Sequence, residues 1–298
     1  MLLFSEGGHH TPIVVEFINH YLGEPVNKFE LAYTKPVWDK IFKYFGTDAE
    51  KVFGPYTAEN AIPWYTVMFV IACLLTIAVI WILKGKLSED SPTNGQLTLE
   101  AGFLTLREML TDIVGDHGMK YFPVVATFAI LILISNLMGF FPLFMAPTAS
   151  TSVTFALGIS SFVYYNYVGI RENGIVAHLS HLAGPIWWMA WFIFPLELIS
   201  NFIRPLSLSI RLFGNIFADE QVAATVSGLG HALGLPDWTT QLLLPLPLMA
   251  LGLLVCLVQT FVFTLLSMIY LSEVSHGDHG HDHDEEHAHE AHAEVAHA

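Results

Sequence analysis

The stretch that decides the fold lies between residues 195 and 220 and reads PLELISNFIRPLSLSIRLFGNIFADE. It falls in a long apolar run, residues 185–217, that is interrupted by Glu197, Arg204 and Arg211. A helix over this run would be ~50 Å long, because each residue adds ~1.5 Å, whereas the hydrocarbon core of a bilayer is ~30 Å thick. We therefore expect a helix that tilts, kinks or lies partly along the membrane, and its two prolines permit kinks.

Polar residues recur through this run at gaps of four, three, three, four, four and four: Glu197, Asn201, Arg204, Ser207, Arg211, Asn215 and Asp219. At ~100° per residue, all of them fall within an arc of ~120° on one helix. We call this set the polar stripe. Polar side chains in hydrocarbon cost free energy unless they face water, a partner or a moving charge. The pattern therefore indicates that the polar stripe is a functional surface.

The two arginines of the stripe have different interpretations. Glu197 is nearly in line with Arg204 but ~10 Å away along the axis, so a salt bridge needs both side chains stretched toward each other. Arg204 can instead extend toward a membrane interface, and we expect a structural role for it. Arg211 has no acid three or four residues away. We therefore expect its counterion on another element or another subunit, and a functional role.

The rest of the chain has the composition of an integral membrane protein. Hydrophobic residues make up 53% of it and charged residues only 13%, against roughly 25% charged residues in soluble domains. Further apolar runs cover residues 64–83, 122–144, 152–170 and 242–271, each about long enough to cross a bilayer as a helix. Because these runs are continuous rather than alternating, they exclude a transmembrane β-barrel.

These patterns predict an all-α polytopic membrane protein. Apolar residues at helical spacing, with charges between them, predict an amphipathic helix over 99–114, on the membrane surface or against the bundle. We expect about five membrane helices plus this one, with the last two long, tilted and joined into a hairpin by a glycine-rich connection at 221–241. Residues 1–61 are expected to form an N-terminal extramembrane segment, 62–274 the membrane domain, and 275–298 a His- and acid-rich disordered tail.

Basic residues near the spans predict the orientation. In a five-span arrangement, one side of the membrane carries Lys84, Lys86, Arg107, Lys120 and Arg171, and Lys51 alone is clearly close to a span on the other side. The excess of Lys and Arg marks the cytoplasmic side, so the amino end is expected outside and the carboxyl end in the cytoplasm. Residues at the amino end resemble neither a secretory signal nor a mitochondrial targeting segment. We expect a multi-pass protein of a bacterial inner membrane.

The sequence of residues 204–220 closely resembles the signature of subunit a of F-type ATP synthases. Three further segments resemble other motifs of that family, in the same order along the chain: Asn136-Leu-Met-Gly139, Pro147-Thr-Ala-Ser150 and Leu257-Val-Gln-Thr-Phe261. The resemblance covers about 62–274. It implies a stator subunit that is no enzyme by itself but translocates protons beside a rotating c-ring. It also implies peripheral-stalk b subunits and the lipid bilayer as partners.

The resemblance implies that Arg211 faces the carboxylate of each passing c subunit, favours its ionised form and prevents a proton short-circuit between two half-channels. The physics agrees, because a guanidinium does not deprotonate in a protein and lowers the pKa of a nearby carboxyl. The proton path is expected to include Glu197, Ser207, Asn215, Asp219, Glu220 and Gln259.

Two details of this path are open in the sequence. Gln259 could hold Arg211 by a hydrogen bond between helices, or it could merely pack. Some family members pair the acid at the Glu220 position with a histidine seven residues before the glutamine, where this chain has Gly252. Asp219 is then expected to supply the missing polarity.

The acidic tail suggests a second, weaker hypothesis. Eight of the 27 acidic residues and eight histidines lie between residues 273 and 298, and imidazole and carboxylate groups suit divalent cations. Weak candidate metal ligands are His279, His281 and His283. The alternative function is thus a divalent metal-ion transporter, which is disfavoured because the two arginines of the stripe would repel a cation. We see no nucleotide fingerprint or phosphate loop and expect no cofactor and no nucleic-acid partner.

Overall fold

The computed structural model describes residues 12–44, 57, 61–85, 87–88, 91–141, 144–174, 190–232, 234, 236 and 246–275. Over these ranges the regular structure is entirely helical. Five of the described helices are long and apolar enough to cross a membrane. They are α4 (Trp64–Lys84), α6 (Phe122–Met138, extended at its start by the short helix η2, Asp116–Tyr121), α7 (Thr151–Asn173), α9 (Ala190–Ala232) and α10 (Leu246–Ser275). The prediction of an all-α polytopic membrane protein is confirmed.

Local sequence sets the ends of several helices. The predicted amphipathic helix is α5 (Asn94–Val114), and Thr93 caps it by accepting a hydrogen bond from the backbone N–H of Gln96. It ends at Gly115, whose φ of 84° suits glycine best, and α7 ends in the same way at Gly174. Among the two expected placements of this amphipathic helix, the structure shows the second, because α5 packs against α4 and α10.

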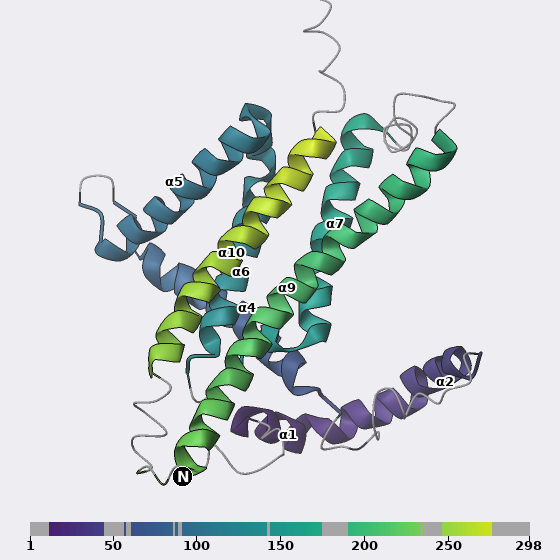
Figure 1. The fold of residues 1–298 in the computed structure, drawn as a ribbon, viewed down its shortest axis with the longest axis vertical. Helices are drawn as coiled ribbons and strands as arrows, with labels where there is room; N and C mark the ends of the chain where they lie inside the picture. Colours follow the sequence, from purple (N-terminus) through teal and green to yellow (C-terminus); the bar gives the residue numbers. More distant parts are fainter. Residues whose placement is uncertain are drawn as a thin grey trace, which may run out of the picture.

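The last two spans form the expected antiparallel hairpin, in which α9 and α10 lie beside each other and run in opposite directions (Figure 1). The connection between them differs from the expectation. Helix α9 has 43 residues and continues to Ala232, so the predicted glycine-rich link at 221–241 is wrong over its first half. Alanine and valine favour or tolerate the helix there, and each internal glycine costs only about 1 kcal/mol.

Helix α9 passes through Pro205 without interruption. Proline has no N–H, so the carbonyl of Asn201 loses its usual partner one turn later. The hydroxyl of Tyr165 on α7 lies 3.4 Å from that carbonyl oxygen and 2.6 Å from the Asn201 side-chain oxygen. A neighbouring helix thus offers α9 a donor at the position where the proline removes one.

Helices α7 and α9 approach each other closely at Gly158. A Cβ atom placed on Gly158 would lie 2.1 Å from the Ser209 hydroxyl oxygen and 2.8 Å from the carbonyl oxygen of Pro205. Glycine therefore lets the two backbones approach, as small residues do between membrane helices. Beside this point a buried cluster ties α6, α7, α9 and α10 together through Ile132, Val153, Leu157, Leu208, Leu212 and Phe263.

Polar contacts join the helices at one end of the bundle. At one end, the start of the second span and the end of the third are joined by a Lys120–Glu172 ion pair of 2.8 Å. The hydroxyl of Ser272 on α10 donates to the carbonyl of Ile113 there. We call this the α10 C-terminal end. The opposite end carries the start of α4 and, in Figure 1, the amino-terminal helix α1.

The segment that the sequence predicts to be extramembrane, residues 1–61, contains helices. The structure has α1 (Ile13–Phe29), a π-helical turn η1 (Glu30–Thr34) and α2 (Lys35–Tyr44) there. Helix α1 contacts α4. The expected tail with His279, His281 and His283 lies outside the described residues.

Candidate functional site

The polar stripe lies where the buried face of α9 meets its exposed face. The buried face consists of Leu208, Ser209, Leu212 and Ile216, which are at most 5% exposed and pack toward the rest of the bundle. Ser207 and Arg211 lie on the exposed face. Asn201, Arg204, Asn215 and Asp219 are half-buried between these two faces. The stripe therefore has an outward part and a part that contacts other helices.

Arg211 belongs to the outward part. In the ranges that the structure describes, no hydrogen bond or ion pair reaches its guanidinium. Its neighbours on the exposed face are apolar, such as Ile210 at 53% exposure and Leu206 at 44%. An unpaired cation on a mostly apolar face of a membrane helix is costly, so the arrangement points to an anion that the described part of the chain does not supply.

One turn after Arg211, an amide pair joins α9 to α10. The side-chain nitrogen of Asn215 donates to the side-chain oxygen of Gln259 at 2.8 Å. Gln259 is 2% exposed, and its own nitrogen has no partner among the described residues. Of the two roles that the sequence left open for Gln259, the structure shows neither a bond with Arg211 nor mere packing: Gln259 accepts a hydrogen bond from Asn215, while Arg211 lies on the exposed face.

A carboxylate lies two turns after Arg211, directly over Gly252. A Cβ atom on Gly252 would lie 3.3 Å from a carboxylate oxygen of Asp219 and 3.4 Å from the ring of Phe140. Asp219 therefore occupies the space beside the α10 position where the sequence lacks a polar side chain. Glu220 is exposed and lies off the stripe, as its spacing predicts.

A buried polar group lies near this part of α9. The hydroxyl of Thr148 donates to the side-chain oxygen of Asn136 at 2.7 Å, and both residues are at most 1% exposed. Thr148 belongs to the short helix η3 (Pro147–Ala149), which packs against α9. Both residues lie in motifs that resemble the family, but neither was predicted as a site residue. A polar side chain within an apolar run was the signal for Asn136.

The half-buried Arg204 has the opposite surroundings from Arg211. Its two terminal nitrogens bind both carboxylate oxygens of Glu273 on α10. Glu197 lies 3.7 Å away, and the guanidinium lies 5.1 Å from the ring centroid of Tyr270. The structural role expected for Arg204 agrees with this cluster. Glu273 was missed, because it stands at the start of the acidic tail and its partner lies 69 residues earlier.

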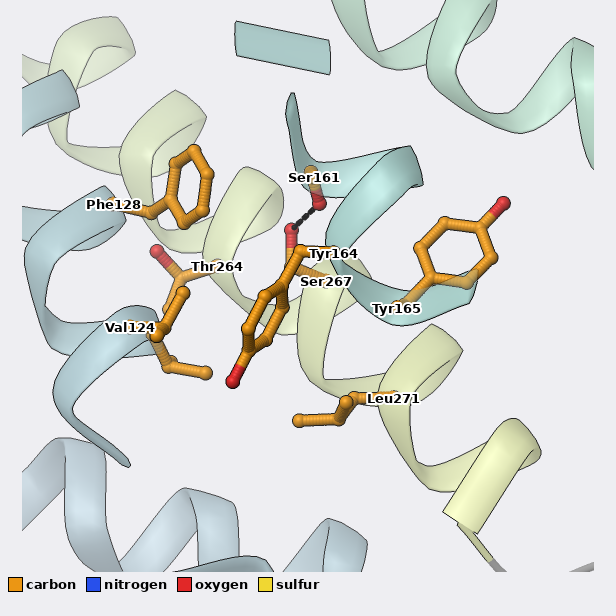
Figure 2. Close-up of a pocket in the computed structure, with 9 residues that line it drawn as sticks. Val124, Phe128, Ser161, Tyr164, Tyr165, Thr264, Ser267 and Leu271 are labelled. Carbon is orange, nitrogen blue, oxygen red and sulfur yellow. Dashed lines mark hydrogen bonds between the residues drawn. The ribbon is translucent and has the colours of Figure 1, made fainter. Parts of the chain in front are cut away.

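A small cavity borders this end of the bundle between α6, α7 and α10. Figure 2 shows that the hydroxyls of Ser161 and Ser267 meet within it, and they are 3.1 Å apart. Tyr164 and Thr264 also line it. About 10 Å³ is open to a water-sized molecule, which is the room of one water at most. The cavity can hold a hydration site but no ligand.

Arg211 therefore stands between two polar groups at different heights on α9. Glu197 lies ~21 Å before it along the axis, at the α10 C-terminal end, and Asp219 lies ~12 Å after it. Within the described ranges, no cluster of three His, Cys, Asp or Glu side chains is arranged to hold a metal ion.

Comparison with known proteins places these features in one family. A family model described as ATP synthase A chain matches residues 66–272, a range that contains the whole polar stripe and Gln259. ATP synthase subunit a 2 of Syntrophotalea carbinolica is 44% identical over 181 residues, which are 61% of this chain and 73% of the relative. ATP synthase subunit a of Geobacter sulfurreducens is 39% identical over 202 residues, covering 68% and 82%. The Aquifex aeolicus subunit is 37% identical over 209 residues, covering 69% and 94%.

Proposed function

The chain belongs to the ATP synthase A chain family, and we propose that it is the stator subunit that connects two proton half-channels to a rotating c-ring. It is a subunit of the membrane sector of an F-type ATP synthase and assembles with the other synthase subunits. The proposal concerns how it moves protons. The observation that carries it is the solitary, exposed Arg211 between polar groups at two different heights of α9.

Arg211 acts on the c-subunit carboxyl in this proposal. The guanidinium stays charged at all relevant pH values, so it neither accepts nor passes on a proton. In a region of low dielectric, it lowers the pKa of a carboxyl that approaches it and promotes proton release. A carboxyl that leaves Arg211 regains its proton from the opposite half-channel. Protons therefore travel round with the ring instead of passing straight across.

The first half-channel leads along the polar groups beyond Arg211 toward the α4 start. Asp219 over Gly252, the Asn215–Gln259 pair and the exposed Glu220 supply carboxylates and amides along this path. Asp219 takes the place of a side chain that α10 lacks at Gly252. In such a path the carboxylates can take up and release protons, and the amides can hydrogen-bond the waters between them.

The second half-channel leads toward the α10 C-terminal end. Glu197 is half-buried there, and Arg204 shares its charge between Glu197 and Glu273. Glu197 is the carboxylate of the polar stripe that lies nearest to this end. Glu197 can thus accept protons that leave the ring. Ser207 lies between the two ends, on the same exposed face as Arg211.

The orientation and the partners are part of the same proposal. The clustering of basic residues at the α10 C-terminal end supports a cytoplasmic location for this end and an external amino end. The membrane domain would be residues 62–274, preceded by an extramembrane amino-terminal segment. Peripheral-stalk b subunits are expected to hold the chain against the torque of the ring.

Arg211→Ala tests the proposal in the assembled synthase. ATP-driven proton pumping into inverted membrane vesicles should be abolished, whereas passive proton leak should persist or rise, because the barrier between the half-channels is gone. Thr225→Ala is the matched control. It removes an exposed side chain from the same helix, and the Thr225 hydroxyl donates to the backbone carbonyl of Gln221, one turn earlier on α9. Pumping is expected to persist in the control. Coupled pumping by the Arg211→Ala synthase would refute the proposed role.

A further inference from the structure

Helix α1 is fixed to the bundle at one point, beside the first turn of α4. Val15 is 1% exposed and packs with Val67 and Met68 of α4. The side chain of Asn19 donates to the carbonyl of Ile62 and accepts from its N–H, both at 3.1 Å. Because α4 is a membrane span that starts two residues after Ile62, these contacts hold α1 at the level where the span leaves the membrane.

Helix α1 has an apolar face that its contacts with the bundle leave exposed. Phe17, Tyr21, Leu22 and Phe29 are 52–66% exposed and fall within an arc of ~140°. Glu16, His20, Glu24 and Asn27 occupy a separate arc of ~80° beside it, and Lys28 lies within the apolar arc. An amphipathic helix of this kind, held beside a membrane span, has its apolar face available to another apolar phase.

Helix α2 continues the pattern and carries positive charge. In Figure 1 it extends away from the helix bundle. Val37, Ile41 and Tyr44 are 55%, 43% and 89% exposed and share one side. The other side carries Lys35, Asp39, Lys40 and Lys43, a net charge of +2 from three lysines and one aspartate.

The π-helical turn between them brings the two apolar faces toward one side. In an uninterrupted α-helix the apolar centres of α1 and α2 would be ~130° apart. A π turn holds about one extra residue, which turns the second face back by ~100° and leaves ~30° between them. Pro36, the second residue of α2, has no N–H for the regular ladder, which favours this irregular turn.

We propose that residues 13–44 form an arm that lies in the headgroup layer of the lipid bilayer, on the α4 N-terminal side. Its apolar face contacts the acyl chains, and the lysines of α2 bind anionic lipid headgroups. The height of α1 beside the span, the amphipathic character of both helices and the positive charge of α2 all favour a lipid surface. The anchor at Ile62 sets the depth, aromatic residues are enriched at this depth in membranes, and basic side chains attract anionic lipids. The proposal requires only that the chain is a membrane protein and is independent of the proton path.

The test uses the full chain, reconstituted in vesicles of equal parts phosphatidylcholine and phosphatidylglycerol. Cys73 and Cys256 are first replaced by alanine. A fluorophore is then attached at Phe17→Cys or Ile41→Cys on the apolar face, and at Asp39→Cys as the control from the opposite face. Nitroxide groups on the acyl chains should quench the first two positions strongly, and aqueous iodide should quench the control.

Two outcomes would overturn the proposal. If iodide quenches positions 17 and 41 as strongly as position 39, the arm lies in water. If, in the assembled synthase, these positions are protected from both quenchers, another subunit covers the face.

Vesicles of two lipid compositions test whether the lysines of α2 bind anionic headgroups. The double substitution Lys40→Gln and Lys43→Gln should reduce nitroxide quenching at position 41 in the vesicles with phosphatidylglycerol, and less so in pure phosphatidylcholine. An equal change in both compositions would show that the lysines do not bind anionic headgroups.

Discussion

Gly158→Ala tests the contact that positions α9. The added Cβ would lie 2.1 Å from the hydroxyl oxygen of Ser209 and 2.8 Å from the carbonyl oxygen of Pro205. The hydroxyl can rotate away, but the carbonyl belongs to the backbone of α9 and can move only with the helix. We expect α7 and α9 to be forced apart at the helix pair that has the most extensive contact in the bundle.

The expected cost is that of overpacking a close-packed interior, about 1–3 kcal/mol of unfolding free energy. A matched control is Gly102→Ala on α5, since a Cβ there would meet nothing within 4 Å. That substitution should be neutral or stabilising by up to ~1 kcal/mol, because alanine favours a helix over glycine. Ser209→Ala in the Gly158→Ala background should restore part of the loss, because it removes the 2.1 Å clash and leaves the 2.8 Å one.

Thermal unfolding of the purified subunit in one detergent, at one scan rate, measures these differences. The scan rate must be fixed because membrane proteins often unfold irreversibly. Gly158→Ala should unfold at a lower temperature than the parent and Gly102→Ala, and the double variant should lie between. Equal stability of Gly158→Ala and Gly102→Ala would refute the close approach of α7 and α9.

Two further predictions concern α9. Ser207→Cys should crosslink to cysteines placed near the c-subunit carboxyl, whereas Ser209→Cys, at a position with 0% exposure, should not; equal crosslinking from both would mean that this face does not meet the ring. Glu273→Gln should lower the unfolding free energy by about 1 kcal/mol, because it breaks a bidentate pair with Arg204 that is only partly shielded from solvent. Glu197→Gln should cost less, since its contact with Arg204 is 3.7 Å; thermal unfolding of both variants decides, and the reverse order would contradict the geometry.

The sequence predicted the spans well because hydrocarbon imposes one demand on every residue of a span. Each backbone polar group must be satisfied within its own helix, so a long apolar run can be little else. The starts and ends of α4 and α7 therefore agree closely with the predicted runs. The end of α9 was harder to place, because small residues such as those after Glu220 are compatible with both a helix and a link.

Contacts between distant residues were less predictable. The spacing of the polar stripe showed which residues of α9 share a face, but not which of them α10 would engage. The sequence left open whether Gln259 bonds Arg211 or merely packs, and the structure joins it to Asn215, one turn after Arg211. The anchor of α1 rests on a buried asparagine that binds backbone atoms of Ile62. Such a contact leaves no periodic signal in the sequence.

Arg204 is ion-paired and Arg211 is not, because α10 carries an acid level with Arg204 but none level with Arg211. The contacts Arg204–Tyr270 and Asn215–Gln259 fix an antiparallel register, in which each step forward on α9 matches one step back on α10. This register puts Arg211 level with Phe263 and the residues that follow it, Thr-Leu-Leu, where α10 has no acid. Arg204, by contrast, is level with the α10 turn that carries Glu273. The charge that balances Arg211 must therefore come from elsewhere, as a carboxylate on a passing c subunit would provide.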